Sequence, residues 1–401
     1  MAADIALTDS SNQLLSFLSG NLAQVDVSKI ERELSRLWDS VGREQGDWKP
    51  VLRACALNVV LLTDEGENES QFDCLLGEIT MRHPCRAILA VIAGGQEEKV
   101  EAWVSARCHF LPGQMDKQVC CEQITVKCSA PEFKPVGMAS VINPLVIPDL
   151  PSWLVAKTEK LDLAMVEPFF AYINHFLIDS RLCGKRPELP CLKALQQKWQ
   201  VALSVSEKYR GCVVADLAWL SINSWRKAIA LAFDNTDVSI DPARLKAIQS
   251  LSIKYGGGSA GFSPALLLVS WLAARLGYKP QSASLHDGIF LASLKDGTEL
   301  SVRIEPEPQA PHGLVSFEMT FCDGGDDKLN IDYIGSALKV VNGDNVEYME
   351  LSWLLSRDKE NIDSEPLWTE LIDLAFEQYS KDPVYLAAIL EASRFLELFN
   401  H

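Results

Sequence analysis

Residues 54–95 contain two dense apolar runs, ACALNVVLLTD (54–64) and RAILAVIAGG (86–95), on either side of SQFDCLLGEITMRHP (70–84). Apolar runs of this length are typical of strands that a sheet buries on both faces, and the intervening stretch has a helical pattern. A strand, a helix and a second strand within about forty residues form a βαβ unit, which joins parallel strands. The sequence therefore predicts an α/β fold in which the N-terminal domain has a mostly parallel sheet.

The flanking segments extend this domain in both directions. An amphipathic helix is predicted at 27–48, with Ile30, Leu34 and Leu37 on its apolar face. Beyond the βαβ unit we expect two alternating strands (100–111 and 120–129), a strand at 139–155, a helix running into a strand at 169–181, and a helix at 189–203.

The second half of the chain changes character after about residue 240. A strand at 245–258 precedes a helix at 263–280, for which Ser263 is the expected N-cap and Gly277 the stop signal. Four β-rich stretches follow (282–294, 299–307, 313–325 and 345–355), and two helices close the chain at 364–379 and 382–399. The predicted organisation is an N-terminal helical segment (1–50), an α/β domain (51–205) and an α+β C-terminal domain (206–401).

Charge and hydropathy exclude several classes of partner. The 401 residues have a net charge of −17, whereas proteins that bind nucleic acid use Lys/Arg surfaces to neutralise phosphates. No apolar run reaches the roughly 20 residues that a membrane span needs. The start, MAADIALTDSSNQ, lacks the basic and apolar regions of a signal peptide. We expect a cytoplasmic protein that binds neither nucleic acid nor membrane.

Motifs for catalysis, metals and cofactors do not form. The six histidines make no HxxxH or HxH pair, so no metal site is expected. Gly256-Gly257-Gly258 lacks the Lys-Ser/Thr of a phosphate-binding loop, and Gly94-Gly95 lacks the spaced third glycine of a dinucleotide site. The sequence therefore predicts neither a cofactor nor an activity of its own.

One catalytic alternative stays open. His175 lies shortly before Asp179 and Ser180, but no GxSxG elbow presents the serine. Asp149 and Asp179 also follow predicted strands, where parallel sheets bind ligands. There Arg181 or Lys185 would meet a sugar phosphate, unless the carboxylates only cap helices.

The stretch CVVADLAWLSINSWRKAIALAFD (212–234) favours binding over catalysis. Trp and Arg are the residues most enriched at the energetic centres of protein interfaces. Asp216, Trp219, Trp225 and Arg226 are therefore candidate partner-binding or interface-supporting residues, with Trp153 and Arg181 in second place. The alternative is that the tryptophans belong to the core.

Eleven cysteines include no CxxC motif, and most are expected to be small buried hydrophobes. The vicinal pair Cys120 and Cys121, and Cys183 with Cys191 around a loop, are candidate redox pairs. A redox role would require a lowered pKa and exposure.

Six segments in order resemble the glucose-6-phosphate dehydrogenase assembly protein family, OpcA. They are RACALNVVLLT (53–63), CEQITVKC (121–128), NPLVIPDLPSWL (143–154), FLIDSR (176–181), DLAWLSINSWRKAIALAFD (216–234) and WLAARLGY (271–278). The resemblance implies a non-catalytic accessory protein of the pentose phosphate pathway that binds glucose-6-phosphate dehydrogenase, promotes its active oligomer and raises its activity. In photosynthetic relatives it also implies a link to thioredoxin. The alternatives are a sugar-phosphate enzyme that uses the N-terminal α/β domain and a thiol-based redox sensor.

Overall fold

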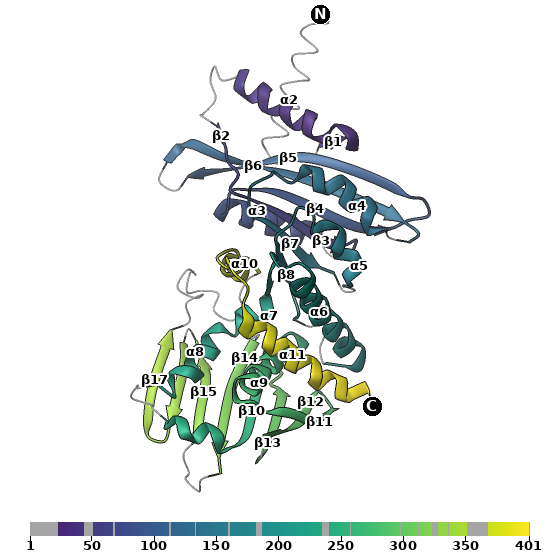
Figure 1. Cartoon of the computed structure of the whole chain (residues 1–401). Helices are drawn as coiled ribbons and strands as arrows, with labels where there is room; N and C mark the ends of the chain where they lie inside the picture. Colours follow the sequence, from purple (N-terminus) through teal and green to yellow (C-terminus); the bar gives the residue numbers. More distant parts are fainter. Residues whose placement is uncertain are drawn as a thin grey trace, which may run out of the picture. The chain divides into compact units, whose positions relative to one another are not determined.

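The chain folds into two compact units, seen here in a computed structural model (Figure 1). Unit 1 comprises Met1–Leu177 and Tyr209–Cys212, and unit 2 comprises Ile178–Lys208 and Val213–His401. Residues 178–205, which the sequence placed with the N-terminal domain, thus group with the second unit. The structure describes residues 23–43, 51–66, 69–111, 114–132, 134–158, 161–181, 187–234, 240–256, 258–296, 298–310, 313–322, 328–335, 337–350 and 368–400.

Unit 1 is built on a mixed, mostly parallel sheet with the strand order β1-β5-β6-β4-β3-β7-β8, and β2 also pairs with β6. β3 runs parallel to β4 and to β7, and β4 runs parallel to β6. β5 pairs antiparallel with β6 and β1 antiparallel with β5. The strands are β1 (Ala23–Val25), β2 (Val51–Arg53), β3 (Leu57–Asp64), β4 (Cys85–Gly94), β5 (Lys99–Leu111), β6 (Gln114–Ala130), β7 (Ser152–Lys157) and β8 (His175–Ile178).

The predicted βαβ unit is confirmed as β3, α3 (Glu69–Arg82) and β4. The side chains from Val59 to Leu62 are at most 1% exposed, so β3 is buried on both faces as its apolar run indicated. The antiparallel extension formed by β5 and β6 is confirmed as well.

A buried ion pair joins the helix α2 (Ile30–Arg43) to this sheet. Arg86 and Glu122 are each about 95% buried, and the Arg86 Nε donates to Glu122 Oε2 at 2.7 Å. Arg86 also donates to Glu31 of α2 at 2.5 Å and to the Leu145 carbonyl at 2.7 Å. The Trp38 indole donates to Glu122 Oε1 at 2.7 Å. The apolar face of α2 and this network together hold the helix against the sheet of unit 1.

The strand predicted at 139–155 is wrong over its first part. Residues Pro135–Ile142 form the helix α4, a 3-10 turn follows at Asn143–Leu145, and only Ser152–Lys157 is a strand. Pro135 sits in the first turn of the helix, where its missing N–H costs nothing. Buried Asn58 then fixes the connection, because it bonds Ile147 through both backbone groups and the Ser152 hydroxyl.

Unit 2 contains an eight-stranded sheet in the order β11-β12-β13-β10-β14-β15-β16-β17. All pairs are antiparallel except β10 with β13. The strands are β10 (Ile248–Gly256), β11 (Lys279–His286), β12 (Ile289–Asp296), β13 (Thr298–Pro306), β14 (Gly313–Phe321), β15 (Lys328–Ile334), β16 (Ala337–Asn342) and β17 (Asn345–Glu350). The hairpin β15–β16 is missing from the sequence prediction, and the single stretch 282–294 is in fact two strands.

The helices α8, α9 and α11 pack against this sheet, and α6 packs on α11 (Figure 1). Phe262 of α9 packs edge-on against Phe290 of β12, which packs against Phe395 of α11. α7 packs against α9. The helices and the short strand β9 are α6 (Leu189–Lys208), β9 (Val213–Asp216), α7 (Leu217–Ser221), α8 (Asn223–Leu231), α9 (Phe262–Leu276), α10 (Trp368–Phe376) and α11 (Pro383–Glu397).

The ends of α9 differ partly from expectation. Gly277 follows the helix with φ of +81°, which confirms the predicted glycine stop. The N-cap is Gly261 rather than Ser263, which lies inside the first turn. A Cβ at Gly261 would stand 2.8 Å from Tyr255 Cβ and 2.9 Å from the Gly256 carbonyl oxygen. This close approach of β10 requires glycine at the cap.

Within the described ranges, no helix combines the length and apolar character needed to cross a membrane.

Candidate functional site

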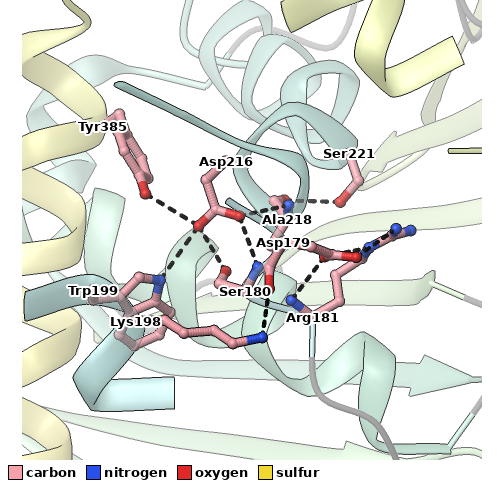
Figure 2. Close-up of polar contacts among 9 residues, drawn as sticks. All are labelled: Asp179, Ser180, Arg181, Lys198, Trp199, Asp216, Ala218, Ser221 and Tyr385. Carbon is pink, nitrogen blue, oxygen red and sulfur yellow. Dashed lines mark hydrogen bonds and ion pairs between the residues drawn. The ribbon is translucent and has the colours of Figure 1, made fainter. Parts of the chain in front are cut away.

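Asp216 is the centre of a buried polar cluster in unit 2 (Figure 2). It ends β9 and caps α7, and its Oδ1 accepts from the backbone N–H groups of Ser180 (3.1 Å) and Ala218 (3.0 Å). Its Oδ2 accepts from the Ser180 hydroxyl at 2.6 Å, from the Trp199 indole at 3.3 Å and from the Tyr385 hydroxyl at 3.1 Å. The side chain is fully buried. One carboxyl group thereby joins β9, α6, α7 and α11.

Burial raises the pKa of Asp216 above its ordinary value of 3.8, although the hydrogen bonds from Ser180 partly offset this. The pKa of Tyr385 is also raised, first by burial and then by the neighbouring carboxyl. A carboxyl group with this many donors is a structural hub, because its lone pairs are already occupied.

Arg181 forms a second, adjoining group with Asp179 (Figure 2). Its Nε and Nη2 donate to the two carboxylate oxygens of Asp179 at 2.9 and 3.0 Å. Lys198 donates to the Asp179 carbonyl at 2.9 Å. Burial raises the pKa of Asp179, but the charge and hydrogen bonds of Arg181 outweigh it, so the net shift is downward. Arg181 is only 7% exposed.

Trp219 and Arg226 form the third group. The Trp219 indole donates to Asp382 Oδ2 at 2.8 Å, and Asp382 caps α11 by accepting from the backbone of Val384 and Tyr385. The Arg226 Cζ lies 3.5 Å from the centroid of the Trp219 ring. Burial lowers the pKa of Arg226 to about 10, opposed by the charge of Asp382.

The candidate tryptophans are buried. Trp219 is 2% exposed and Trp225 is 5% exposed. In unit 1, Trp153 is 2% exposed and stacks on His175 with ring centroids 4.4 Å apart. Asp216, Trp219, Trp225, Arg226 and Arg181 come together in unit 2, whereas Trp153 belongs to unit 1. Their burial suits support of a surface better than direct contact with a partner.

The side chains of the catalytic alternative are each engaged elsewhere. Ser180 donates to Asp216, and Asp179 is paired with Arg181. The His175 Nδ1 lies 2.6 Å from Asn174 Oδ1. Burial lowers the pKa of His175. The described residues contain no cluster of three or more His, Cys, Asp or Glu suited to a metal ion.

The candidate cysteines pair differently from the expectation. Cys120 is disulfide-bonded to Cys108, which lies directly opposite it on β5. Its vicinal neighbour Cys121 is free and buried, and burial raises the pKa of its thiol to about 11. Successive residues of a strand point to opposite faces, so Cys120 and Cys121 point apart. Cys191 is free and half-buried, and Cys183 lies outside the described residues.

Four residues of the cluster lie outside 212–234, the stretch that suggested the site: Ser180, Trp199, Tyr385 and Asp382. Asp382 is followed by Pro383, which is a helix-start pattern and could have marked it as a cap. The partnership of Tyr385 with Asp216 spans 169 residues and only the tertiary fold reveals it.

One side of α8 is exposed to solvent. Lys227 and Ala230 are exposed, Leu231 is 41% exposed, and Arg226 is partly exposed.

Comparison with known proteins places the cluster in a known family. Residues 77–197 match the model of the glucose-6-phosphate dehydrogenase subunit N-terminal domain, and residues 212–320 match that of its C-terminal domain. An OxPP cycle protein OpcA of Nostoc punctiforme is 31% identical over 213 residues, which are 53% of this chain and 42% of that protein. Its counterpart in Synechocystis is 27% identical over 216 residues, 53% of this chain and 41% of that protein. The chain spans less than half the length of these two relatives.

Among solved structures, myo-inositol 2-dehydrogenase from Lactobacillus plantarum is similar at a TM-score of 0.43 and 9% identity, over 86% of this chain and 96% of that one. The two domain matches lie in order and include Asp179, Ser180, Arg181, Asp216, Trp219 and Arg226. The chain belongs to the OpcA family of glucose-6-phosphate dehydrogenase assembly proteins.

Proposed function

We propose that this chain is a non-catalytic assembly factor that binds glucose-6-phosphate dehydrogenase and favours its active oligomer. The observation that carries the proposal is the use of the 212–234 stretch as a rigid framework. Asp216 accepts five hydrogen bonds, and the indole of Trp219 joins α7 to α11. These side chains therefore hold the surrounding helices in fixed positions. Interface residues held by packing lose little entropy on binding.

The exposed side of α8 is our proposed contact. Lys227, Ala230 and Leu231 lie on it, and Arg226 stacks beneath on Trp219. In this proposal Asp216, Trp219, Trp225 and Arg226 fix the position of α8, Arg181 supports the cluster through Asp179, and Trp153 stabilises unit 1.

Activation would need selective binding. A partner that binds the active and the inactive dehydrogenase equally shifts no equilibrium. The ratio of the two affinities limits how far the equilibrium shifts toward the active form. By linkage, the substrate strengthens binding of the assembly factor by the same factor by which the assembly factor strengthens binding of the substrate.

The direct test is to titrate glucose-6-phosphate dehydrogenase from the same organism with this protein at fixed substrate concentration. Saturable activation together with a complex on size-exclusion chromatography supports the proposal. No complex and no activation, in reducing and in oxidising buffer, contradicts it, and turnover of sugar phosphates by the isolated protein would favour the enzyme alternative.

Two variants test the surface on α8. Lys227→Glu reverses an exposed charge on α8, and Lys193→Glu makes the same change at an exposed position of α6. We expect Lys227→Glu to weaken the complex at least about tenfold, mainly through slower association and altered salt dependence, and Lys193→Glu to leave it unchanged. Equal affinities for both variants and the wild type would remove α8 from the interface.

Redox control of the activation is a second candidate function, favoured by the disulfide between Cys108 and Cys120. A dithiol reductant of the thioredoxin class would pass two electrons and two protons to this bond, which leaves two thiols here and a disulfide on the reductant. Alkylation and mass spectrometry before and after reduction would count the released thiols. Activation that changes on reduction in the wild type, but not in Cys108→Ser, supports redox control; unchanged activation contradicts it.

A further inference from the structure

The eight-stranded sheet of unit 2 has one face that the described helices do not cover. α8 and α9 pack on the opposite face, onto β16 and onto β10, β13 and β14 respectively. On the uncovered side, the outward residues of neighbouring strands align in cross-strand rows, and we call this surface the open face. The open face is separate from the proposed contact with the dehydrogenase, because none of the residues proposed to contact that enzyme lies on it.

One row of the open face consists of small hydroxyl side chains. In register across five strands lie Ser282, Ser293, Ser301, Ser250 and Thr320. Ser282 and Ser293 are 2.8 Å apart through their hydroxyl oxygens, and Ser250 and Thr320 are 2.6 Å apart. Because these side chains are short, a second backbone can approach this part of the sheet closely.

A second row alternates in charge. In register lie Glu305, Lys254, Ser316, Asp332, Lys339 and Tyr348. Two ion pairs within the face, Arg303 with Glu305 at 2.6 Å and Lys328 with Glu318 at 2.7 Å, show the same mixture of signs.

The open face carries basic and acidic residues in equal number, although the chain as a whole is strongly acidic. Apart from Lys279 of the edge strand, whose ammonium pairs with Glu391 of α11 at 2.6 Å, its outward strand positions carry five basic residues: Lys254, Lys295, Arg303, Lys328 and Lys339. They also carry five acidic residues: Glu299, Glu305, Glu318, Asp332 and Glu350. With a net charge of −17, two copies of the chain repel each other over most of their surface. A face with equal numbers of both signs is where two copies can meet without that cost.

Exposed apolar side chains gather on the same face. Of the eight exposed large apolar side chains described in unit 2, four point outward here: Leu291 (40% exposed), Ile334 (50%), Val346 (47%) and Tyr348 (63%). Tyrosine is among the residues enriched in protein interfaces. Eight strands about 4.8 Å apart and about six residues long span roughly 700 Å², close to the roughly 800 Å² per partner of a standard-size interface.

We infer that the open face binds a second copy of this chain, sheet against sheet, in a twofold dimer. A twofold interface uses the same patch on both copies and must be complementary to itself. A surface with alternating charges and a row of short hydroxyl side chains meets this requirement.

Analytical ultracentrifugation of the full chain tests the inference, with Ser252→Arg and Ser301→Arg as variants. Both serines point outward on the open face, on β10 and β13. Ser140→Arg is the matched control, because Ser140 is exposed on α4 in unit 1. Circular dichroism and thermal unfolding of all three variants establish that the fold is retained.

The wild type and Ser140→Arg are expected to sediment at twice 44.4 kDa. Each variant of the open face should raise the dimer dissociation constant at least about tenfold, since a bulky charge is inserted into the centre of the contact. A wild type that stays monomeric at the highest concentration overturns the inference. So does a dimer that both open-face variants leave intact. If the wild type is monomeric and Ser252→Arg abolishes the complex with the dehydrogenase, the second-copy inference fails and the face belongs to that enzyme.

Discussion

The guanidinium of Arg226 lies 3.5 Å above the ring of Trp219, whose indole N–H donates to Asp382 at 2.8 Å. The tryptophan thus contacts a cation on its face and a carboxylate at its edge. This arrangement joins α7, α8 and the start of α11, which are 163 residues apart in sequence at Trp219 and Asp382. One short stretch of sequence thus supplies both the Trp and the Arg of this contact.

Trp219→Phe should destabilise the protein by about 2–4 kcal/mol, because it removes a buried hydrogen bond to a charged group and part of the surface under Arg226. Urea unfolding followed by tryptophan-independent circular dichroism measures the change. Trp225→Phe is the control for the loss of indole volume at a buried site. Equal losses in the two variants would show that the contacts of Trp219 with Asp382 and Arg226 add nothing.

Asp216 gives a prediction about pH. Its pKa is raised in the folded protein, chiefly by burial, so between 3.8 and the raised value the folded state binds more protons than the unfolded state. The free energy of unfolding therefore falls as the pH rises through this interval, by up to about 1.4 kcal/mol per pH unit. In Asp216→Asn this contribution is absent.

The comparison of Asp216→Asn with the wild type from pH 4 upward isolates the effect, because all other groups titrate in both proteins. The stability of the variant relative to the wild type should increase with pH and then level off. A difference that is constant with pH would mean that Asp216 keeps its ordinary pKa on folding.

Arg86→Met should cost about 3–5 kcal/mol, since it leaves the buried carboxylate of Glu122 without its main cation. The double variant Arg86→Met/Glu122→Gln should regain part of the lost stability. Chemical denaturation with a probe in unit 1 gives the values. Lys134→Met breaks an exposed pair with Glu98 at 3.1 Å and should cost less than about 1 kcal/mol; a similar cost at both sites would contradict the role of burial.

Gly261→Ala should destabilise unit 2 by about 1–3 kcal/mol, because the new methyl group overlaps Tyr255 and the Gly256 carbonyl. Gly137→Ala, on α4 with nothing within 4 Å of the added Cβ, should be neutral or stabilising by up to about 1 kcal/mol. Thermal unfolding of both variants makes the comparison. If Gly261→Ala is tolerated as well as Gly137→Ala, β10 is free to move away from α9.

Segments with a strong local pattern were predictable. The uninterrupted apolar run of β3 and β4 identified the parallel sheet, and Gly277 marked the end of α9, because buried strands and left-handed caps leave their pattern in neighbouring residues. The segment at 139–149 was not predictable, since Asn58, distant in sequence, fixes it through hydrogen bonds to Ile147 and Ser152.

By itself, the sequence determined the α/β class of the first half, the family, and the stretch 212–234 on which the candidate site is built. These depend on side-chain periodicity and on order along the chain, which are local properties. Only the tertiary structure decided that Asp216 bonds Tyr385 and Ser180, that Cys120 pairs with Cys108, and that hydroxyl side chains of five strands, four serines and one threonine, form one row. The physical reason is that burial and strand register depend on contacts between residues far apart in sequence, and no local pattern specifies which of many partners a buried carboxyl or a thiol will meet.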